Sequence, residues 1–312
     1  MKLALISSSN KTYLAYFLLT FTALFWSSNI VVGKYLNTDI SPLTLAFWRW
    51  FVATLILVPL TFSYLRNDWQ RIVKQWKLMV FLSLLGVSLF NTILYYSTQS
   101  TDATNIALIQ TSMPLMVVVI SFVLFSQKIS IGTFIGLLFG IMGAMIVIFK
   151  GSFSLSFSTS NFTNTVSIGD VSMLLAVFIY ALYSVLLVKV QKIHQYSLLL
   201  VTFMIGTLLL TPFFLWEQFS SGTFIPDTSS TLLILYLAIF PSILAYLFWN
   251  FGVAEIGSHT TGLFICFIPV FTPMIAAIFL NEILYFYHYL GILMIILSVG
   301  IVHWSKKPMS QK

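Results

Sequence analysis

The sequence predicts an all-α integral membrane protein of ten transmembrane helices, arranged as two inverted five-helix repeats with both termini in the cytoplasm. Three observations lead to this fold class. The composition is too apolar for a soluble domain, the two halves of the chain repeat each other, and the Lys and Arg residues gather on one side of the predicted spans.

The composition indicates membrane-spanning helices. Of the 312 residues, 59% are hydrophobic and 7% are charged, with a mean hydropathy of +0.99. Soluble domains carry about 25% charged residues, so this chain could not cover a water-facing surface. Membrane barrels alternate apolar and polar residues, whereas Met113–Phe125 and Phe134–Phe149 are apolar on every side. Helices are therefore the expected spanning structure.

Ten apolar runs have about the length that a membrane helix needs, roughly 20 residues. The first follows Lys11 without a clear small-residue cleavage site, so we expect a retained helix rather than a signal peptide. The longest break, 151–169, is rich in Ser, Thr, Asn and Phe. In chain order the predicted spans are Tyr13–Gly33, Pro42–Leu65, Leu78–Ser97, Thr104–Phe125, Ile131–Phe149, Val171–Val190, Ser197–Trp216, Leu232–Gly252, Thr261–Leu280 and Tyr287–Trp304.

The basic residues orient these spans, because cytoplasmic loops carry an excess of Lys and Arg. Ten spans place both termini on one side. That side also receives most of the basic residues, which explains the pI of about 9.4 without nucleic-acid binding. The other side has Lys34 and Lys150, and Arg49 lies within a span. The residues on the predicted cytoplasmic side are Lys2, Lys11, Arg66, Arg71, Lys74, Lys77, Lys128, Lys189, Lys192, Lys306, Lys307 and Lys312.

The repeat is predicted to be inverted. Leu94–Lys150 aligns with Trp249–Ser305 without a gap, and Pro114 and Pro269 are each followed 22 residues later by a glycine. Five helices in each half make the second half start from the opposite side. Inverted repeats of this kind let a site open alternately to the two sides of a membrane. The predicted organisation is a first repeat at 13–150, an external connector at 151–169 and a second repeat at 170–305.

Several short motifs, spread over nearly the whole chain, are shared with one transporter family. They are Leu24–Asn29, Ser41–Arg49, Gln110–Pro114, Ile268–Pro269, Leu280–Glu282 and Leu290–Gly291. In these motifs the sequence resembles the EamA family of the drug/metabolite transporter superfamily. The resemblance implies a ten-helix inner-membrane protein that moves small metabolites, often amino acids or toxic solutes, outward. It also implies a cavity lined mainly by helices 1, 3 and 4 of one half and 6, 8 and 9 of the other.

The sequence departs from the family pattern after the fourth helix. The family has Leu-Gly-Glu there, and this chain has Phe125, Ser126 and Gln127. The carboxylate is present only at Glu282 in the second half. A paired role for two glutamates is therefore in doubt.

Arg49 is the charged residue that lies well inside a predicted span. An Arg at mid-bilayer costs about 2.5–3.5 kcal/mol on insertion scales, so it should face protein or a wet cavity. Two interpretations stay open: a counter-charge for a carboxylate substrate, or a donor that bonds helices together. Its counterpart in the repeat is Met204, so the charge is confined to one half.

Further candidates for binding substrate are polar and aromatic residues inside the spans. Residues four apart share a helix face, and such stripes suit a small-molecule site with aromatic walls. Packing and interhelical hydrogen bonding are the alternative role for each of them. They are Trp26, Asn29, Asn91, Tyr95, Gln99, Tyr180, Tyr183, Tyr246 and Asn250.

Proline and glycine mark further positions. Pro114 frees the backbone carbonyl of Gln110 one turn earlier, and Pro269 does the same in the second half. We predict kinks at both prolines, which are candidates for gating, and include Gln110 among the binding candidates. A stripe of small residues in the fifth helix predicts close helix packing or a dimer seam, so a homodimer is one expected partner state. The stripe consists of Gly132, Gly136, Gly140 and Gly143.

The function predicted from these features is secondary transport, with export of amino acids or similar small metabolites by alternating access. Uptake or exchange of a nucleotide-like or S-adenosylmethionine-like metabolite is the alternative. An intramembrane enzyme is the alternative of another class, and the sequence has no HExxH motif or catalytic constellation at depth to favour it. We expect no cofactor, no metal site and no nucleic-acid partner; the partners are a small-molecule substrate and the lipid bilayer.

Overall fold

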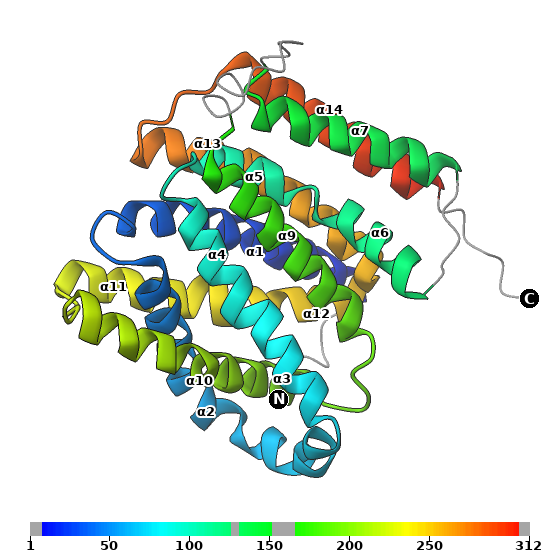
Figure 1. Ribbon diagram of the computed structural model, residues 1–312. Coiled ribbons are helices and arrows are strands. Elements are labelled where there is room, and N and C mark those ends of the chain that lie inside the picture. The colour runs from blue at the N-terminus through cyan, green and yellow to red at the C-terminus, as the bar shows by residue number, and fades with distance from the viewer. Residues whose placement is uncertain (1–7, 126–130, 152–165, 306–312) are drawn as a thin grey trace, which may run out of the picture.

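The computed structural model describes residues 8–125, 131–151 and 166–305, and the regular secondary structure of these residues is helical (Figure 1). Two short elements are π-helical, η1 and η2, and one is a 3₁₀ helix, η3. In chain order the elements are α1 Ser8–Leu36, α2 Pro42–Lys74, α3 Trp76–Ser83, η1 Leu84–Leu89, α4 Phe90–Ser97, α5 Ala103–Gln110, α6 Met113–Phe125, α7 Ile131–Ile148, α9 Ile168–Leu187, α10 Gln195–Ser221, α11 Thr228–Leu237, η2 Ala238–Leu244, α12 Ala245–Gly262, η3 Leu263–Phe267, α13 Ile268–Phe279 and α14 Phe286–Ser305.

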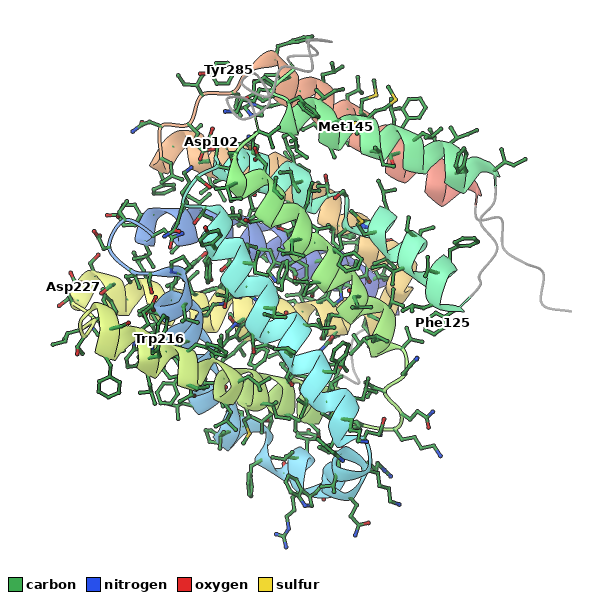
Figure 2. The ribbon with its side chains drawn as sticks, in the orientation of Figure 1. Asp102, Phe125, Met145, Trp216, Asp227 and Tyr285 are labelled. Carbon is green, nitrogen blue, oxygen red and sulfur yellow. The ribbon has the colours of Figure 1, made fainter. Side chains whose placement is uncertain are left out.

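The length and surface of these helices identify an integral membrane protein. Seven helices in the described part of the chain are long and apolar enough to cross a membrane, and three shorter apolar helices accompany them. Large apolar side chains such as Met145 and Trp216 lie on the outside of the bundle (Figure 2), and Trp216 is 72% exposed. Such a surface suits lipid. The all-helical membrane fold is thus confirmed, while the ten crossings and the cytoplasmic termini stay predictions.

Two predicted spans contain a π-helical turn at corresponding places in the two halves. The third predicted helix is α3, η1 and α4 in succession, and the eighth is α11, η2 and α12. In each π segment a serine donates to the carbonyl five residues back. Ser88 Oγ lies 3.5 Å from Ser83 O, and Ser242 Oγ lies 2.8 Å from Leu237 O. Such turns are rare and occur often at functional sites.

The structure has a break in the helix at each of the two predicted prolines. Pro114 lies in the first turn of α6, directly after a turn at Thr111 and Ser112 that ends α5. Pro269 lies in the first turn of α13, directly after the 3₁₀ helix η3. Proline is tolerated in a first turn because its missing N–H is not needed there. The first break places the non-helical turn at Thr111 and Ser112 in the interior of the bundle, where both residues are buried.

Acidic side chains bind the helix pair α2 and α10 together at both ends. At one end, Ser41 Oγ donates to Glu217 Oε2 over 2.6 Å. At the other, Ser197 Oγ donates to Asp68 Oδ2 over 2.8 Å. Each carboxylate lies against the N-terminal turn of the partner helix, where negative charge is stabilising. We call these two ends of the bundle the Glu217 end and the Asp68 end.

The glycine stripe of α7 faces the chain's own helices. α7 and α14 run side by side at one edge of the bundle (Figure 1). Ser298 Oγ of α14 donates to Gly136 O over 2.6 Å, and a Cβ on Gly140 would lie 1.8 Å from a methyl of Leu115. Gly291 of α14 leaves room for Val147 in the same way. The stripe therefore serves the close packing predicted for it, inside one chain. The homodimer stays a prediction.

Some helix boundaries differ from the predicted ones. α2 continues to Lys74 rather than ending at Leu65, because Leu65, Asp68 and Ile72 lie on one face that is buried against the bundle. α12 is helical to Gly262, across the predicted break after the eighth span. Residues 152–165 of the predicted connector, and Gln127, lie outside the described residues.

Candidate functional site

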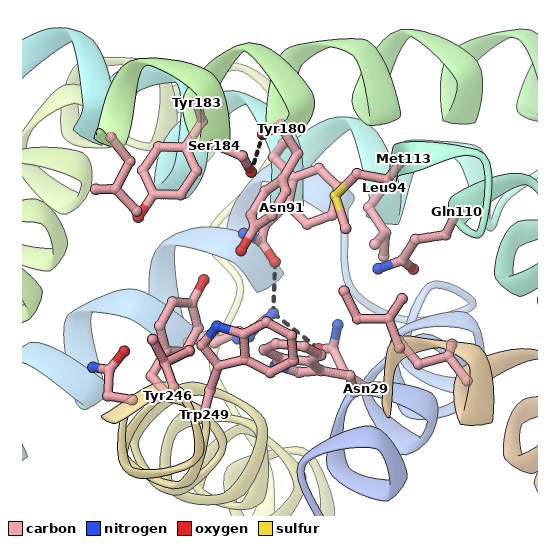
Figure 3. Close-up of a pocket in the computed structure, with 18 residues that line it drawn as sticks. Asn29, Asn91, Leu94, Gln110, Met113, Tyr180, Tyr183, Ser184, Tyr246 and Trp249 are labelled. Carbon is pink, nitrogen blue, oxygen red and sulfur yellow. Dashed lines mark hydrogen bonds between the residues drawn. The ribbon is translucent and has the colours of Figure 1, made fainter. Parts of the chain in front are cut away.

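The bundle encloses a cavity of about 420 Å³, within the range of small-molecule sites, about 300–1,000 Å³. Its wall comes from the six helices that the family resemblance implied, with one residue added from α2. Nine of the predicted site residues line it together (Figure 3). They are Trp26, Asn29, Arg49, Asn91, Gln110, Tyr180, Tyr183, Tyr246 and Asn250.

Arg49 is the centre of a hydrogen-bond network at this cavity. Its side chain is 2% exposed. Nη1 donates to Asn29 Oδ1 at 2.9 Å and to Asn91 Oδ1 at 2.8 Å, and it lies 2.8 Å from the hydroxyl of Tyr95. Nε donates to Ser242 Oγ in η2 at 2.7 Å. The guanidinium thus joins α1, α2, α4 and η2, which belong to both halves of the chain.

The partners of Arg49 leave its charge uncompensated. All of them are neutral oxygen atoms, and the face of Trp50 adds a cation–π contact with its centroid 4.6 Å from Cζ. In the described part of the chain, Arg49 forms no ion pair, and its hydrogen bonds use Nε and Nη1 but not Nη2. No acidic residue is among those that line the cavity. A buried cation with donors to spare is suited to an anionic ligand.

Aromatic rings form much of the remaining wall. The ring of Trp26 lies 5.2 Å from that of Trp249 and 6.2 Å from that of Tyr246. Across the cavity, the rings of Tyr180 and Tyr183 are 5.2 Å apart (Figure 3). Rings of this kind bind apolar groups and, through their faces, cations. The wall can therefore accept a ligand that carries an ammonium group or an apolar side chain.

Gln110 offers a polar atom on the same wall. It is the last residue of α5, before the break that precedes Pro114. Its Oε1 is buried and has no hydrogen-bond partner in the described structure. Buried polar atoms are rarely left without a partner, so an unpaired one on a cavity wall calls for an explanation. An acceptor in this position could bind a donor group of a ligand.

Two predicted site residues do not line the cavity. Tyr95 is fully buried behind Arg49, and its hydroxyl donates to Asn29 Oδ1 at 2.7 Å, so it positions the network. Gln99 lies in the exposed turn after α4, because the helix ends at Ser97. α4 therefore ends before the four-residue spacing of Asn91 and Tyr95 reaches Gln99. The apolar part of the wall was not predicted: Phe90, Leu94, Met113, Leu187, Val253 and Ile268.

The carboxylates of the described chain lie at the ends of the bundle. Glu282, on the loop after α13, accepts from the backbone N–H groups of Ala103 at 2.7 Å and Thr104 at 3.1 Å, the first residues of α5. Lys34 Nζ lies 3.7 Å from Glu282 and 3.2 Å from Asp102. We call this group the Glu282 latch; it lies at the Glu217 end and connects the two halves of the chain.

A membrane-embedded helical bundle with a polar and aromatic cavity has the architecture expected of a solute transporter. The family comparison agrees with this class. The sequence model of the EamA-like transporter family matches residues 13–149 and 167–304, and the chain belongs to this family.

Curated relatives support the assignment, and a solved structure shares the fold. An uncharacterized transporter of Archaeoglobus fulgidus is 29% identical over 88% of this chain and 91% of its own. The uncharacterized transporter YetK of Bacillus subtilis is 28% identical over 90% of this chain and 84% of its own. A crystal structure of 15% identity covers 91% of this chain and 94% of its own with a TM-score of 0.60, which shows a shared fold. The relatives are named as transporters rather than enzymes.

Proposed function

We propose that this protein is an inner-membrane secondary transporter that exports small carboxylate-bearing metabolites, first of all amino acids, by alternating access. The observation that carries the proposal is Arg49, a buried cation on the cavity wall without a carboxylate partner in the described chain. A ligand carboxylate would supply the missing charge. Pairs of guanidinium and carboxylate are strong and well oriented, because the two groups can form parallel hydrogen bonds.

The rest of the cavity supports an amino acid in particular. A carboxylate at Arg49 leaves an ammonium group to be bound, and the wall offers the unpaired Oε1 of Gln110 and the ring faces of Trp26, Trp249 and Tyr246. These groups provide an acceptor and cation–π surfaces. The cavity volume is near the lower end of small-molecule sites.

A nucleotide-like or S-adenosylmethionine-like substrate is the alternative. A phosphorylated ligand carries several negative charges and is normally bound by more than one cation. Among the residues that line the cavity, Arg49 supplies the positive charge. One cation matches one carboxylate, which favours a ligand with a single carboxylate, such as an amino acid, over a nucleotide.

The orientation and direction are part of the proposal. By the positive-inside rule, the excess of Lys and Arg favours an orientation with the Asp68 end in the cytoplasm and the Glu217 end outside. The Glu282 latch would then close the outer side in the conformation described here. Opening would require its contacts to break while others form at the Asp68 end, as alternating access demands.

The test is solute flux with Arg49 variants in proteoliposomes. Radiolabelled amino acids and the amines that lack their carboxylates are compared for the native protein, Arg49→Lys and Arg49→Gln. Arg66→Gln, an exposed arginine at the Asp68 end, is the matched control. We expect Arg49→Gln to abolish amino-acid flux, Arg49→Lys to raise KM, and the control to behave as the native protein.

Two readouts separate substrate binding from folding. Size-exclusion profiles and thermal unfolding show whether each variant keeps its fold, and ligand-induced thermal stabilisation reports binding without flux. If a folded Arg49→Gln protein binds and moves carboxylate-bearing solutes as well as the native protein does, the proposed counter-charge role is wrong. If amines move as well as amino acids, the carboxylate is not recognised.

A further inference from the structure

A second cavity of about 380 Å³ lies between α6 and α9, outside the central cavity. Ser184 of α9 lines both cavities, so this one residue stands at their boundary. The Ser184 hydroxyl donates to the carbonyl of Tyr180 at 2.8 Å, so this small side chain is turned back onto its own helix at the boundary (Figure 3). The two cavities are therefore neighbours that share Ser184 as a wall residue.

The walls of the second cavity are apolar apart from a few groups. On α6, Val117, Ser121 and Phe125 follow one another at four-residue spacing and therefore share a face. On the other side, the wall consists of Ser184 and Val185 of α9 and of Val188 and Lys189 in the turn that follows it. Phe125 lies at the edge of the bundle in Figure 2. The cavity thus leads from the surface at the Asp68 end inward along two helix faces.

Lys189 gives the outer end of this cavity a positive charge. It is exposed, and its Nζ lies 5.3 Å from the ring centroid of Phe125. It forms no ion pair in the described chain. The residues that line the two cavities include two cations, Lys189 outside and Arg49 inside, and no carboxylate. An anion would meet positive charge at Lys189 in the second cavity and at Arg49 in the central one, with mainly apolar wall around Ser184.

We propose that the gap between α6 and α9 is the entry route by which an anionic solute reaches the central cavity from the Asp68 end. The inference rests on the proposed function and adds the path to it. Lys189 attracts the anion at the mouth, Ser184 leaves the boundary open because its side chain is small, and Arg49 binds the carboxylate. Charges arranged in this way raise the local concentration of an oppositely charged ligand and its rate of association.

Charged thiol reagents test the route without relying on transport. Ser184→Cys is introduced with Cys266→Ser, the only native cysteine being replaced. The variant in proteoliposomes is exposed at the Asp68 end to ethylsulfonate and ethyltrimethylammonium methanethiosulfonates. The ratio of their rates, normalised to a free thiol, measures the electrostatic preference of the path.

We expect the normalised ratio to favour the sulfonate, and to fall at least about twofold on Lys189→Gln, the size of one unit charge several ångströms away. Lys192→Gln, a neighbouring exposed lysine, is the matched control and should leave the ratio unchanged. Raising the salt concentration to 1 M should reduce the preference for the sulfonate reagent, because salt screens exposed charges. An unchanged ratio in Lys189→Gln would overturn the proposal.

Two further outcomes distinguish the route from its alternatives. If Ser184→Cys reacts in detergent but not in lipid vesicles, lipid fills the gap and the entry route is wrong. If Ser184→Trp leaves the initial rate and KM of a moved solute unchanged, the solute takes another path, even though Arg49 retains its role. Failure of Arg49→Gln to affect flux, with the thiol results as expected, would refute the proposed substrate recognition and not the path.

Discussion

Replacing Glu282 by Gln should weaken the Glu282 latch and shift the protein toward opening at the Glu217 end. The carboxylate accepts two backbone N–H groups at the start of α5 and the hydroxyl of Thr104 at 2.8 Å, and Lys34 lies 3.7 Å away. Gln keeps one acceptor oxygen but loses the charge. The rest of the bundle is unaffected by the change, so its effect falls on the contact between the two halves.

The size of the effect follows from the interactions that an amide at this position cannot form. Negative charge at a helix N-terminus is worth about 0.3–1 kcal/mol, a hydrogen bond to a charged group about 1.5–3 kcal/mol, and a partly exposed ion pair about 0.2–1 kcal/mol. The glutamine amide retains part of these interactions, so we expect the substitution to weaken the latch by about 2 kcal/mol. That is a shift of roughly thirtyfold in the equilibrium between latched and open states.

The assay is the labelling rate of a cysteine in place of Leu94 on the cavity wall, with Cys266→Ser, by an impermeant reagent applied at the Glu217 end. Glu282→Gln should raise this rate by up to about thirtyfold, the factor that corresponds to about 2 kcal/mol. Asp39→Asn, an exposed carboxylate at the same end, is the control. If Glu282→Gln stays folded and labels at the native rate, the latch does not hold this end closed and the reasoning is refuted.

Three other changes have definite expected outcomes. Gly86→Ala puts a Cβ 2.7 Å from the ring of Tyr183, so it should displace the ring into the cavity and raise KM, as measured by flux. Gly140→Ala should lower the thermal unfolding midpoint by separating α7 from its neighbours, with ligand binding retained; a native midpoint would contradict the packing. Hydrogen bonds from Ser230 hold the pKa of Asp227 below its usual range. This stabilisation is present at neutral pH and lost as the pH falls through the lowered pKa. The thermal unfolding midpoint of Asp227→Asn should therefore fall less on acidification than that of the native protein.

The sequence was informative where a physical cost makes a residue stand out. An arginine inside a span cannot face lipid, so the burial of Arg49 followed from depth alone, whereas its partners Asn29 and Asn91 did not. The apolar runs predicted the helices because lipid demands both length and apolarity. The prolines predicted the breaks in helices 4 and 9 because the ring removes a donor.

Other features depend on partners far away in the chain. Glu282 caps a helix 179 residues earlier, and nothing local to either segment announces that contact. Both π-helical turns were missed, although Pro241 within η2 is a local signal for one of them; η1 contains no proline. Gln99 was misplaced because helix ends are harder to predict than helix existence. The glycine stripe indicated a close contact but could not say with which helix.

The absence of a carboxylate beside Arg49 in the described chain also has an electrical consequence. An empty carrier would hold one uncompensated positive charge in the cavity, and a bound monoanion would cancel it. Moving one charge through the full field is worth about 2.3 kcal/mol per 100 mV, so a membrane potential would act on the return of the empty carrier and hardly on the loaded step. A cell interior that is negative would hold the empty site toward the cytoplasm, and the potential would then favour export of a monoanion, whereas a full cycle with a zwitterionic amino acid would move no net charge.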